Sequence, residues 1–209
     1  YSNVMTTFTP SLRKAIEKSK SLEINTIAPG HGPVYRKNPQ KIIDDYSRFS
    51  LYAEGAGKNE ITILWGSMYG MTAKAVGYVE RILQREGVRY NKVEMPLKSD
   101  SEMVATVFKS AGIIIAAPTY EYKLFPPVAA ALDELGRKRI TGKAAFRFGS
   151  YGWSGGAEKE LKEIVERNRM DWDFIESVEF QGAPREEDLI KVEDGVLKLI
   201  KMMKNKVVE

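Results

Sequence analysis

The sequence contains no cysteine and only one histidine. Without cysteine, the chain can form no disulfide, iron–sulfur cluster or Cys-based zinc site, which fits a cytoplasmic location. Long hydrophobic runs are also missing, and a run such as Ile113 to Ala117 is far too short to span a membrane. The N-terminus lacks the basic and then apolar segments of a signal peptide. We therefore expect a chain without disulfides and without a membrane-embedded part.

Charge of one sign does not dominate. The 209 residues include 32 Lys and Arg against 28 Asp and Glu, for a net charge of +4. No basic cluster is dense enough to indicate nucleic-acid binding, so we expect a mixed, solvated surface. The length suits one large domain, or one ordinary domain with a further segment. Because the chain starts at Tyr1 rather than Met, we expect it to be part of something longer.

From Asn59 onward, apolar runs typical of strands alternate with segments of helical periodicity. The predicted strands are 61–65, 88–95, 112–117, 143–149 and 174–180. The predicted helices are 73–86, 100–110, 126–136, 157–169 and 185–204. Strict alternation predicts a doubly wound α/β domain with five parallel strands and helices on both faces. Ligands bind such sheets beyond the carboxyl ends of the strands, so the loops after the first, third and fourth strands form the candidate site.

The segment before Asn59 follows a different pattern. Its expected elements are two helices at 11–20 and 39–52, a short strand at 24–28 and a flexible linker at 54–58. Two helices and one strand make a poor core. We therefore expect this segment to lean on the surface of a partner.

The first candidate loop, 66–72, offers an anion site at a helix N-terminus. Its hydroxyls, two glycines and run of backbone N–H groups favour a phosphate, as does the helix dipole. The loop lacks the Gly-Lys-Ser/Thr of a Walker A motif and the GxGxxG of a dinucleotide site. This composition suits a monophosphate held by hydrogen bonds. The alternative is an ordinary turn between strand and helix.

The second and third loops suit a flat ligand. In the second loop, 117–127, Thr119 and nearby backbone could bond the polar edge of a planar ring, while Tyr120 and Tyr122 could cover its face. The third loop, 149–156, combines four glycines with aromatic residues, so its backbone can approach a flat group closely. Alternatively, the tyrosines only fill the second loop and the glycines only make the third one flexible. Three such loops at one edge of a sheet favour a single shared site.

These loops resemble a known family. The sequences at 67–72, 118–120 and 149–155 are similar to the FMN loops in the flavodoxin-like domain of A-type flavoproteins, also called flavodiiron proteins. Upstream, 27–36 resembles the end of that family's metallo-β-lactamase-like domain, and the helix at 39–52 matches the connection between the two domains. The resemblance implies a partial metallo-β-lactamase-like remnant with its linker at 1–58. It also implies a flavodoxin-like FMN-binding domain at 59–209.

The resemblance also implies roles for individual residues. The FMN phosphate would be held by Ser67, Met68, Tyr69, Gly70, Met71 and Thr72. The isoalloxazine ring would be lined by Pro118, Thr119 and Tyr120, and contacted from the third loop by Ser150, Tyr151, Gly152, Trp153 and Gly155. Among these, Trp153 would be the stacking partner. The redox chemistry would belong to the cofactor, and the protein would set its potential and orientation.

Only the family resemblance suggests a metal-binding role for His31. A single histidine in a loop is usually not a ligand, but this position matches the last histidine ligand of the family's di-iron centre. The other ligands, including a His-x-Glu-x-Asp motif, are absent from this sequence, and Glu23 and Asp44 are not suitably spaced to replace them. The chain therefore cannot complete a di-iron centre alone. Either it is a fragment, or a second polypeptide supplies the missing lactamase-like part.

The intact family would reduce oxygen to water or nitric oxide to nitrous oxide. Electrons would come from rubredoxin, its reductase or a similar donor, enter at FMN and pass to the irons, in cytoplasmic head-to-tail dimers. One alternative is a stand-alone FMN-dependent NAD(P)H or quinone oxidoreductase of the same fold, although no clear nicotinamide site is visible. An interaction module that lost its cofactor is a second alternative. A hydrolase is a third, but one histidine cannot build the metal cage it needs.

Overall fold

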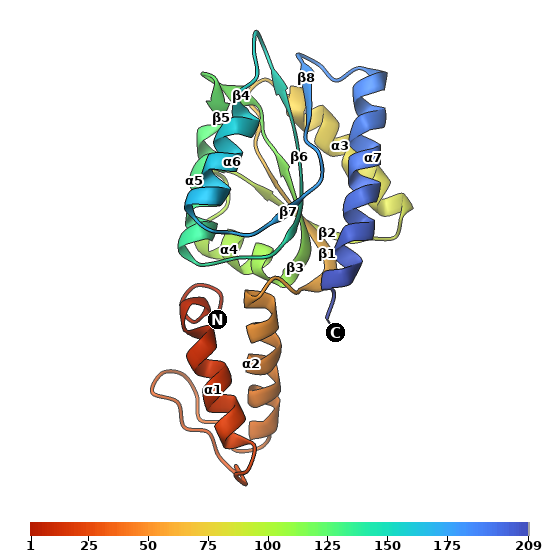
Figure 1. Cartoon of the computed structure of the whole chain (residues 1–209). Coiled ribbons are helices and arrows are strands. Elements are labelled where there is room, and N and C mark those ends of the chain that lie inside the picture. The colour runs from red at the N-terminus through yellow and green to blue at the C-terminus, as the bar shows by residue number, and fades with distance from the viewer. Residues whose placement is uncertain (209) are drawn as a thin grey trace.

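The computed structural model describes residues 1–208 and contains one main parallel sheet (Figure 1). Its strands lie in the order β2-β1-β3-β6-β7, and β8 also pairs with β6. The strands are β1 (Lys58–Trp65), β2 (Arg89–Glu94), β3 (Ser110–Ala116), β6 (Ala144–Tyr151), β7 (Asp173–Phe174) and β8 (Val178–Gln181). A separate antiparallel hairpin joins β4 (Thr119–Tyr120) to β5 (Lys123–Leu124). The predicted flavodoxin-like, doubly wound parallel sheet is thereby confirmed.

Helices cover both faces of the sheet. The seven α-helices among residues 1–208 are α1 (Thr9–Ser19), α2 (Pro39–Ala53), α3 (Met71–Arg85), α4 (Asp100–Lys109), α5 (Pro126–Arg137), α6 (Ala157–Arg167) and α7 (Glu186–Met203). The short 3₁₀ helices are η1 (Thr6–Phe8) and η2 (Lys204–Lys206). Side chains of α4, α5 and α6 share one hydrophobic core, and those of α3 and α7 share the other. Strand β3 is buried on both faces, as a continuously apolar central strand should be.

The fifth predicted strand, 174–180, is two short pieces instead of one. The register explains the break. Ala145 of β6 faces Phe174, whereas Phe148 faces Val178. Three steps along β6 therefore correspond to four steps along the edge, and the extra residue must leave the ladder, as in a β-bulge. The edge strand consequently divides into β7 and β8.

The predicted strand at 24–28 is also wrong. The structure has only an isolated antiparallel bridge there, in which Ile27 and Tyr35 exchange two backbone hydrogen bonds of 3.0 and 2.9 Å. A strand needs a paired neighbour along its length. Within the described part of the chain, this segment finds a partner only at that one point.

The N-terminal segment projects from the lower end of the sheet as the helix pair α1 and α2 (Figure 1). It is attached by aromatic contacts: the Tyr1 ring stacks on Phe108 of α4 with 5.6 Å between centroids, and buried Tyr52 meets the same ring edge-on. The expected flexible linker at 54–58 is instead fixed by hydrogen bonds. Gly57 donates to the Lys206 carbonyl and accepts from Val208 N–H, both at 2.9 Å.

A buried lysine reinforces this junction. Lys143 is fully enclosed, and its Nζ donates to the carbonyl oxygens of Ala56 and Phe108 at 2.9 and 3.0 Å. Burial, with a smaller contribution from the nearby Lys206 charge, lowers the pKa of Lys143 to about 7. The Lys143 side chain thus joins the chain just before β6 to α4 and to the segment that leads into β1.

None of the helices described in residues 1–208 combines the length and the apolar character needed to cross a membrane.

Candidate functional site

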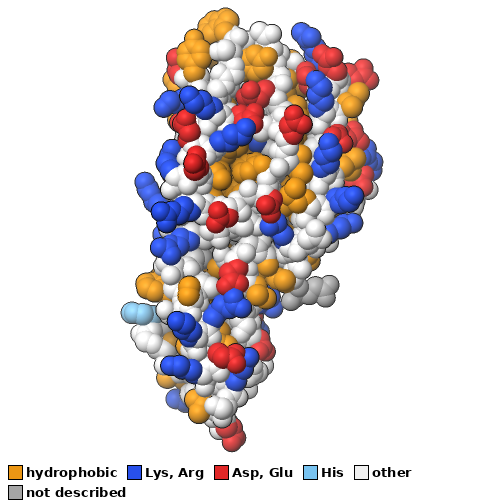
Figure 2. Space-filling model, in the orientation of Figure 1, with side chains coloured by type: hydrophobic (Ala, Val, Ile, Leu, Met, Phe, Trp, Pro, Cys, Tyr) orange, Lys and Arg blue, Asp and Glu red, His pale blue; other side chains and the backbone are white. Residues whose placement is uncertain are grey.

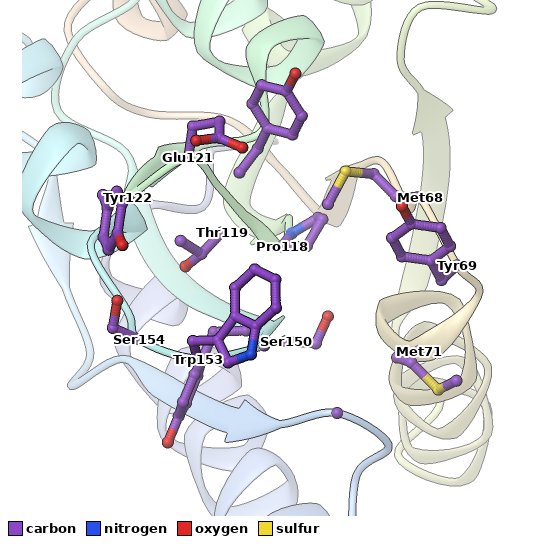
Figure 3. A pocket seen from close by; sticks show the side chains of 14 residues that line it. Met68, Tyr69, Met71, Pro118, Thr119, Glu121, Tyr122, Ser150, Trp153 and Ser154 are labelled. Atoms are coloured by element: carbon purple, nitrogen blue, oxygen red, sulfur yellow. The ribbon is translucent and has the colours of Figure 1, made fainter.

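A cavity of about 400 Å³ opens at the carboxyl edge of the sheet (Figure 3). It lies between the three loops predicted to form the site, and its wall is also reached by the turn after β8. The lining residues are Met68, Tyr69, Met71, Pro118, Thr119, Tyr120, Glu121, Tyr122, Ser150, Tyr151, Gly152, Trp153, Ser154 and Gly182. This is the expected ligand position in a doubly wound sheet.

The first loop presents a free helix N-terminus. Gly70, with φ +80°, is the N-cap of α3, and its N–H donates to the Ser67 hydroxyl at 3.1 Å. No side chain among residues 1–208 caps this helix. Its first N–H groups are therefore open to an anionic ligand, and the helix dipole adds to the attraction. Thr72, in the first turn, is buried and bonds Ser150 of the third loop.

The second loop is a tight hairpin that sequence reasoning did not predict. Glu121 and Tyr122 lie between β4 and β5 with φ values of 46° and 62°, and positive φ at both central residues is typical of a type I′ turn. The Leu124 N–H donates to the Glu160 carboxylate of α6 at 2.7 Å, which anchors the hairpin. Thr119 Oγ1 is buried and has no hydrogen-bond partner among the described residues. An orphaned hydroxyl on a cavity wall is suited to bond a ligand.

The third loop packs closely on the second. A Cβ at Gly149 would overlap the carbonyl oxygen of Ala117, and one at Gly156 would overlap that of Tyr122. Glycine at these two positions therefore lets two backbones meet beside the cavity. The apolar rim is open: Trp153 is 97% exposed and Tyr69 is 84% exposed. In Figure 3 the Trp153 indole stands in front of the cavity, between Tyr122 and Tyr69.

An ion pair between a buried arginine and a partly exposed glutamate lies beneath these two loops. Arg147 of β6 has a side chain that is 0% exposed, and its guanidinium contacts Glu179 of β8 with 2.6 Å between Nη1 and Oε1. Its Nη2 donates to the Ala117 carbonyl at 3.2 Å. Burial lowers the pKa of Arg147, and the Glu179 carboxylate opposes that shift. Sequence reasoning missed this pair, although a charged residue inside the apolar stretch 144–149 is a visible signal.

Most of the predicted binding residues line the cavity. Four do not: Ser67, Gly70 and Thr72 shape the first loop behind the wall, and Gly155 lies beside Glu179. Tyr122, which we expected to cover a flat ligand, lines the cavity as well. Three further lining residues, Glu121, Ser154 and Gly182, were not predicted. Gly182 could have been found, because it follows the last strand, which ends at the same edge.

His31 lies away from this cavity, on the N-terminal segment. It is exposed, between two glycines within the turn closed by the Ile27–Tyr35 bridge. Figure 2 shows it in pale blue on the lower part of the molecule, on a face where positive and negative side chains are interspersed. Nowhere in residues 1–208 do three or more potential metal ligands cluster.

Comparison with known proteins extends these observations. No protein-family model matches the chain. It is 29% identical over 191 residues to a nitric oxide reductase of Moorella thermoacetica, an alignment that covers 90% of this chain and 47% of the relative. It is 32% identical over 161 residues to an anaerobic nitric oxide reductase flavorubredoxin of Vibrio vulnificus, covering 75% of this chain and 32% of the relative. The chain thus spans less than half the length of either relative.

Solved structures share the fold. Rubredoxin:oxygen oxidoreductase of Desulfovibrio gigas superposes on 99% of this chain and 51% of its own with a TM-score of 0.87 at 23% identity. The flavodiiron protein of Giardia intestinalis gives a TM-score of 0.82 at 24% identity, over 98% of this chain and 50% of its own. An archaeal flavodoxin covers 69% of this chain and 99% of its own, with a TM-score of 0.59 at 20% identity.

The strand order and the cavity at the carboxyl edge define a flavodoxin-like α/β protein. In sequence the chain is similar to nitric oxide reductases over less than half of their length. In fold it matches about half of each of the two solved proteins, rubredoxin:oxygen oxidoreductase and the Giardia flavodiiron protein.

Proposed function

We propose that the cavity binds FMN and that the chain is the electron-transfer part of a flavodiiron oxidoreductase. The observation that carries the proposal is the orphaned Thr119 hydroxyl on the wall of a cavity formed by three loops. A flat ring with a polar edge would satisfy that hydroxyl, and the apolar rim would cover its face. When bound, FMN supplies the capacity to accept and donate electrons, while the protein binds and orients it.

The first loop fits a monophosphate. The open N-terminus of α3 and the loop hydroxyls offer donors, whereas residues 66–72 contain no Lys or Arg. In this proposal the phosphate is held by Ser67, Met68, Tyr69, Gly70, Met71 and Thr72. The ring is lined by Pro118, Thr119 and Tyr120 and contacted by Ser150, Tyr151, Gly152, Trp153 and Gly155. The neighbouring Tyr122 and Gly182 complete the rim.

The names of the relatives support a proposal for the role of the whole protein. We propose that it reduces oxygen to water or nitric oxide to nitrous oxide in the cytoplasm. A rubredoxin-type donor, or its reductase, would deliver electrons to the flavin site of a head-to-tail dimer. The names of the relatives support this assignment, since they include nitric oxide reductases and a rubredoxin:oxygen oxidoreductase.

We assign 1–58 to the end of a metallo-β-lactamase-like domain with its linker, and 59–209 to the FMN domain. The archaeal flavodoxin, which matches 69% of this chain over nearly all of its own length, supports a separate flavin domain. On the N-terminal segment the exposed apolar side chains Val4, Phe8, Leu22 and Val34 support a covering surface from outside this chain. His31 would be one iron ligand, with the other ligands supplied from there.

The test is titration of the purified chain with FMN, followed by flavin fluorescence. We expect quenching that saturates at one FMN per chain, and a bound flavin absorbance band. Protein that leaves FMN fluorescence unchanged would overturn the proposal. Steady-state oxidation of NADH by the FMN-loaded chain alone would instead favour the stand-alone reductase.

A further inference from the structure

The Arg147–Glu179 pair touches both loops that would hold the flavin ring. Arg147 Nη2 bonds the Ala117 carbonyl, directly before Pro118 of the second loop. Glu179 lies under the third loop, where a Cβ on Gly155 would come within 2.6 Å of its Oε2. Gly149, at the start of that loop, would place a Cβ 3.1 Å from Arg147 Nη2. One ion pair therefore contacts both ends of the third loop and the base of the second.

Stability alone does not account for the pair. Removing an arginine from water is costly, and buried ion pairs are often no more stabilising than apolar residues of the same size. Arg147 is also incompletely satisfied, since its Nε has no hydrogen-bond partner within residues 1–208. The surrounding positions of β6, such as Phe146 and Phe148, are apolar and fully buried. A charge at this point of an apolar strand indicates a role beyond packing.

The position of the pair gives it an electrostatic effect on the cavity. Arg147 is enclosed by protein, so its charge is weakly screened, whereas the Glu179 side chain is 25% exposed. Glu158, at the start of α6, is a further negative group whose charge acts on Arg147. Full reduction adds two electrons to a flavin, and where only one proton accompanies them the ring gains one negative charge. A buried positive charge under the ring loops would favour that reduced form.

We propose that Arg147 and Glu179 are positioning residues that set the reduction potential of the flavin through their opposite charges. This inference rests on the proposed function, since it requires FMN in the cavity. It predicts shifts of opposite sign for the two partners. Glu179→Gln leaves the arginine uncompensated and should make the potential more positive. Arg147→Met leaves the carboxylate uncompensated and should make it more negative.

The experiment compares wild type, E179Q, R147M and R147K. The affinity for oxidised FMN is measured by fluorescence quenching, and the potential by equilibration with a redox dye under dithionite. Together they give the affinity for reduced FMN by linkage. We expect the ratio of reduced to oxidised affinity to rise roughly threefold or more in E179Q and to fall by a similar factor in R147M. R147K retains the charge and should stay near the wild-type ratio.

A matched control removes an ion pair elsewhere on the same face. Arg167 and Asp133 join α6 to α5 with the same 2.6 Å separation but do not line the cavity. R167M should therefore leave the potential unchanged.

Shifts of the same sign in E179Q and R147M, or no shift, would overturn the inference while FMN binding stands. If R147M does not fold, the direction of the potential shift in E179Q alone tests the inference, and a negative shift or none would overturn it. Failure of wild type to bind FMN would overturn the proposed function instead.

Discussion

The Thr72 hydroxyl lies 3.1 Å from the Ser150 hydroxyl, although 78 residues separate them in the chain. The contact joins the first turn of α3 to the end of β6, and Ser150 N–H also points to the Thr72 hydroxyl at 3.4 Å. The phosphate loop and the third loop are therefore held in register by side chains and not by the sheet alone.

Loss of this link should weaken FMN binding. In Ser150→Ala the Thr72 hydroxyl loses its side-chain partner and keeps only the 3.4 Å contact with the backbone N–H of residue 150. We expect a cost of about 1 kcal/mol, which corresponds to roughly fivefold in affinity. Fluorescence titration with FMN measures the change. Ser101→Ala, at an exposed serine of α4, is the control and should bind like wild type. Equal affinities for S150A and wild type would contradict this prediction.

Gly149 should tolerate no side chain. Its Cβ would overlap the Ala117 carbonyl, so Gly149→Ala must push the second and third loops apart. We expect a loss of about 1–3 kcal/mol in the free energy of unfolding and at least a fivefold loss in FMN affinity. Chemical denaturation and FMN titration measure the two effects.

The control for that variant is Gly77→Ala. Gly77 is in the middle of α3, where an added Cβ meets nothing within 4 Å. The helix should gain about 0.5–1 kcal/mol. If G149A were as stable as wild type while G77A behaved as expected, the close approach of the two loops would not be essential.

Thr119→Val should weaken FMN binding without destabilising the unliganded protein. The hydroxyl it removes is buried without a partner in the described structure, so the unliganded protein should be as stable or slightly more stable. FMN, however, should bind several-fold more weakly. Thr62→Val is a contrasting variant, because Thr62 bonds Ser110 Oγ at 2.8 Å and its loss should destabilise the fold by about 1 kcal/mol. Thermal unfolding without FMN and titration with it distinguish these outcomes.

Lys143 predicts a pH dependence of stability. Its pKa is about 7 in the folded protein against 10.5 ordinarily. Between these values the unfolded chain binds one proton more, so the free energy of unfolding should rise with pH by up to about 1.4 kcal/mol per unit. Below pH 7 both states are protonated, and the penalty of burying the charge is fully present.

Lys143→Met isolates this effect from other titrations. The difference in unfolding free energy between wild type and K143M, followed by denaturation from neutral to alkaline pH, should shift steadily in favour of wild type. A difference that stays constant over this range would show that Lys143 keeps its ordinary pKa when folded.

The sheet and the three loops could be predicted because both leave a local pattern in the sequence. Apolar runs such as 112–117 indicate buried strands, and the glycines at 149–156 indicate a loop after a strand. The sequence did not predict the turn at Glu121 and Tyr122, since neither residue type favours positive φ. The break between β7 and β8 depends on how these strands pair with β6, and no local sequence pattern shows that pairing. Arg147 was visible as a charge, but its partner Glu179 is 32 residues away, and only folding brings the two together.

Gly57 donates to the Lys206 carbonyl and accepts from the Val208 N–H, so the chain enters β1 beside the place where it leaves η2. The stretch that leads into β1 and the stretch that follows α7 are bonded to each other, so we expect the two to open together when the protein unfolds locally.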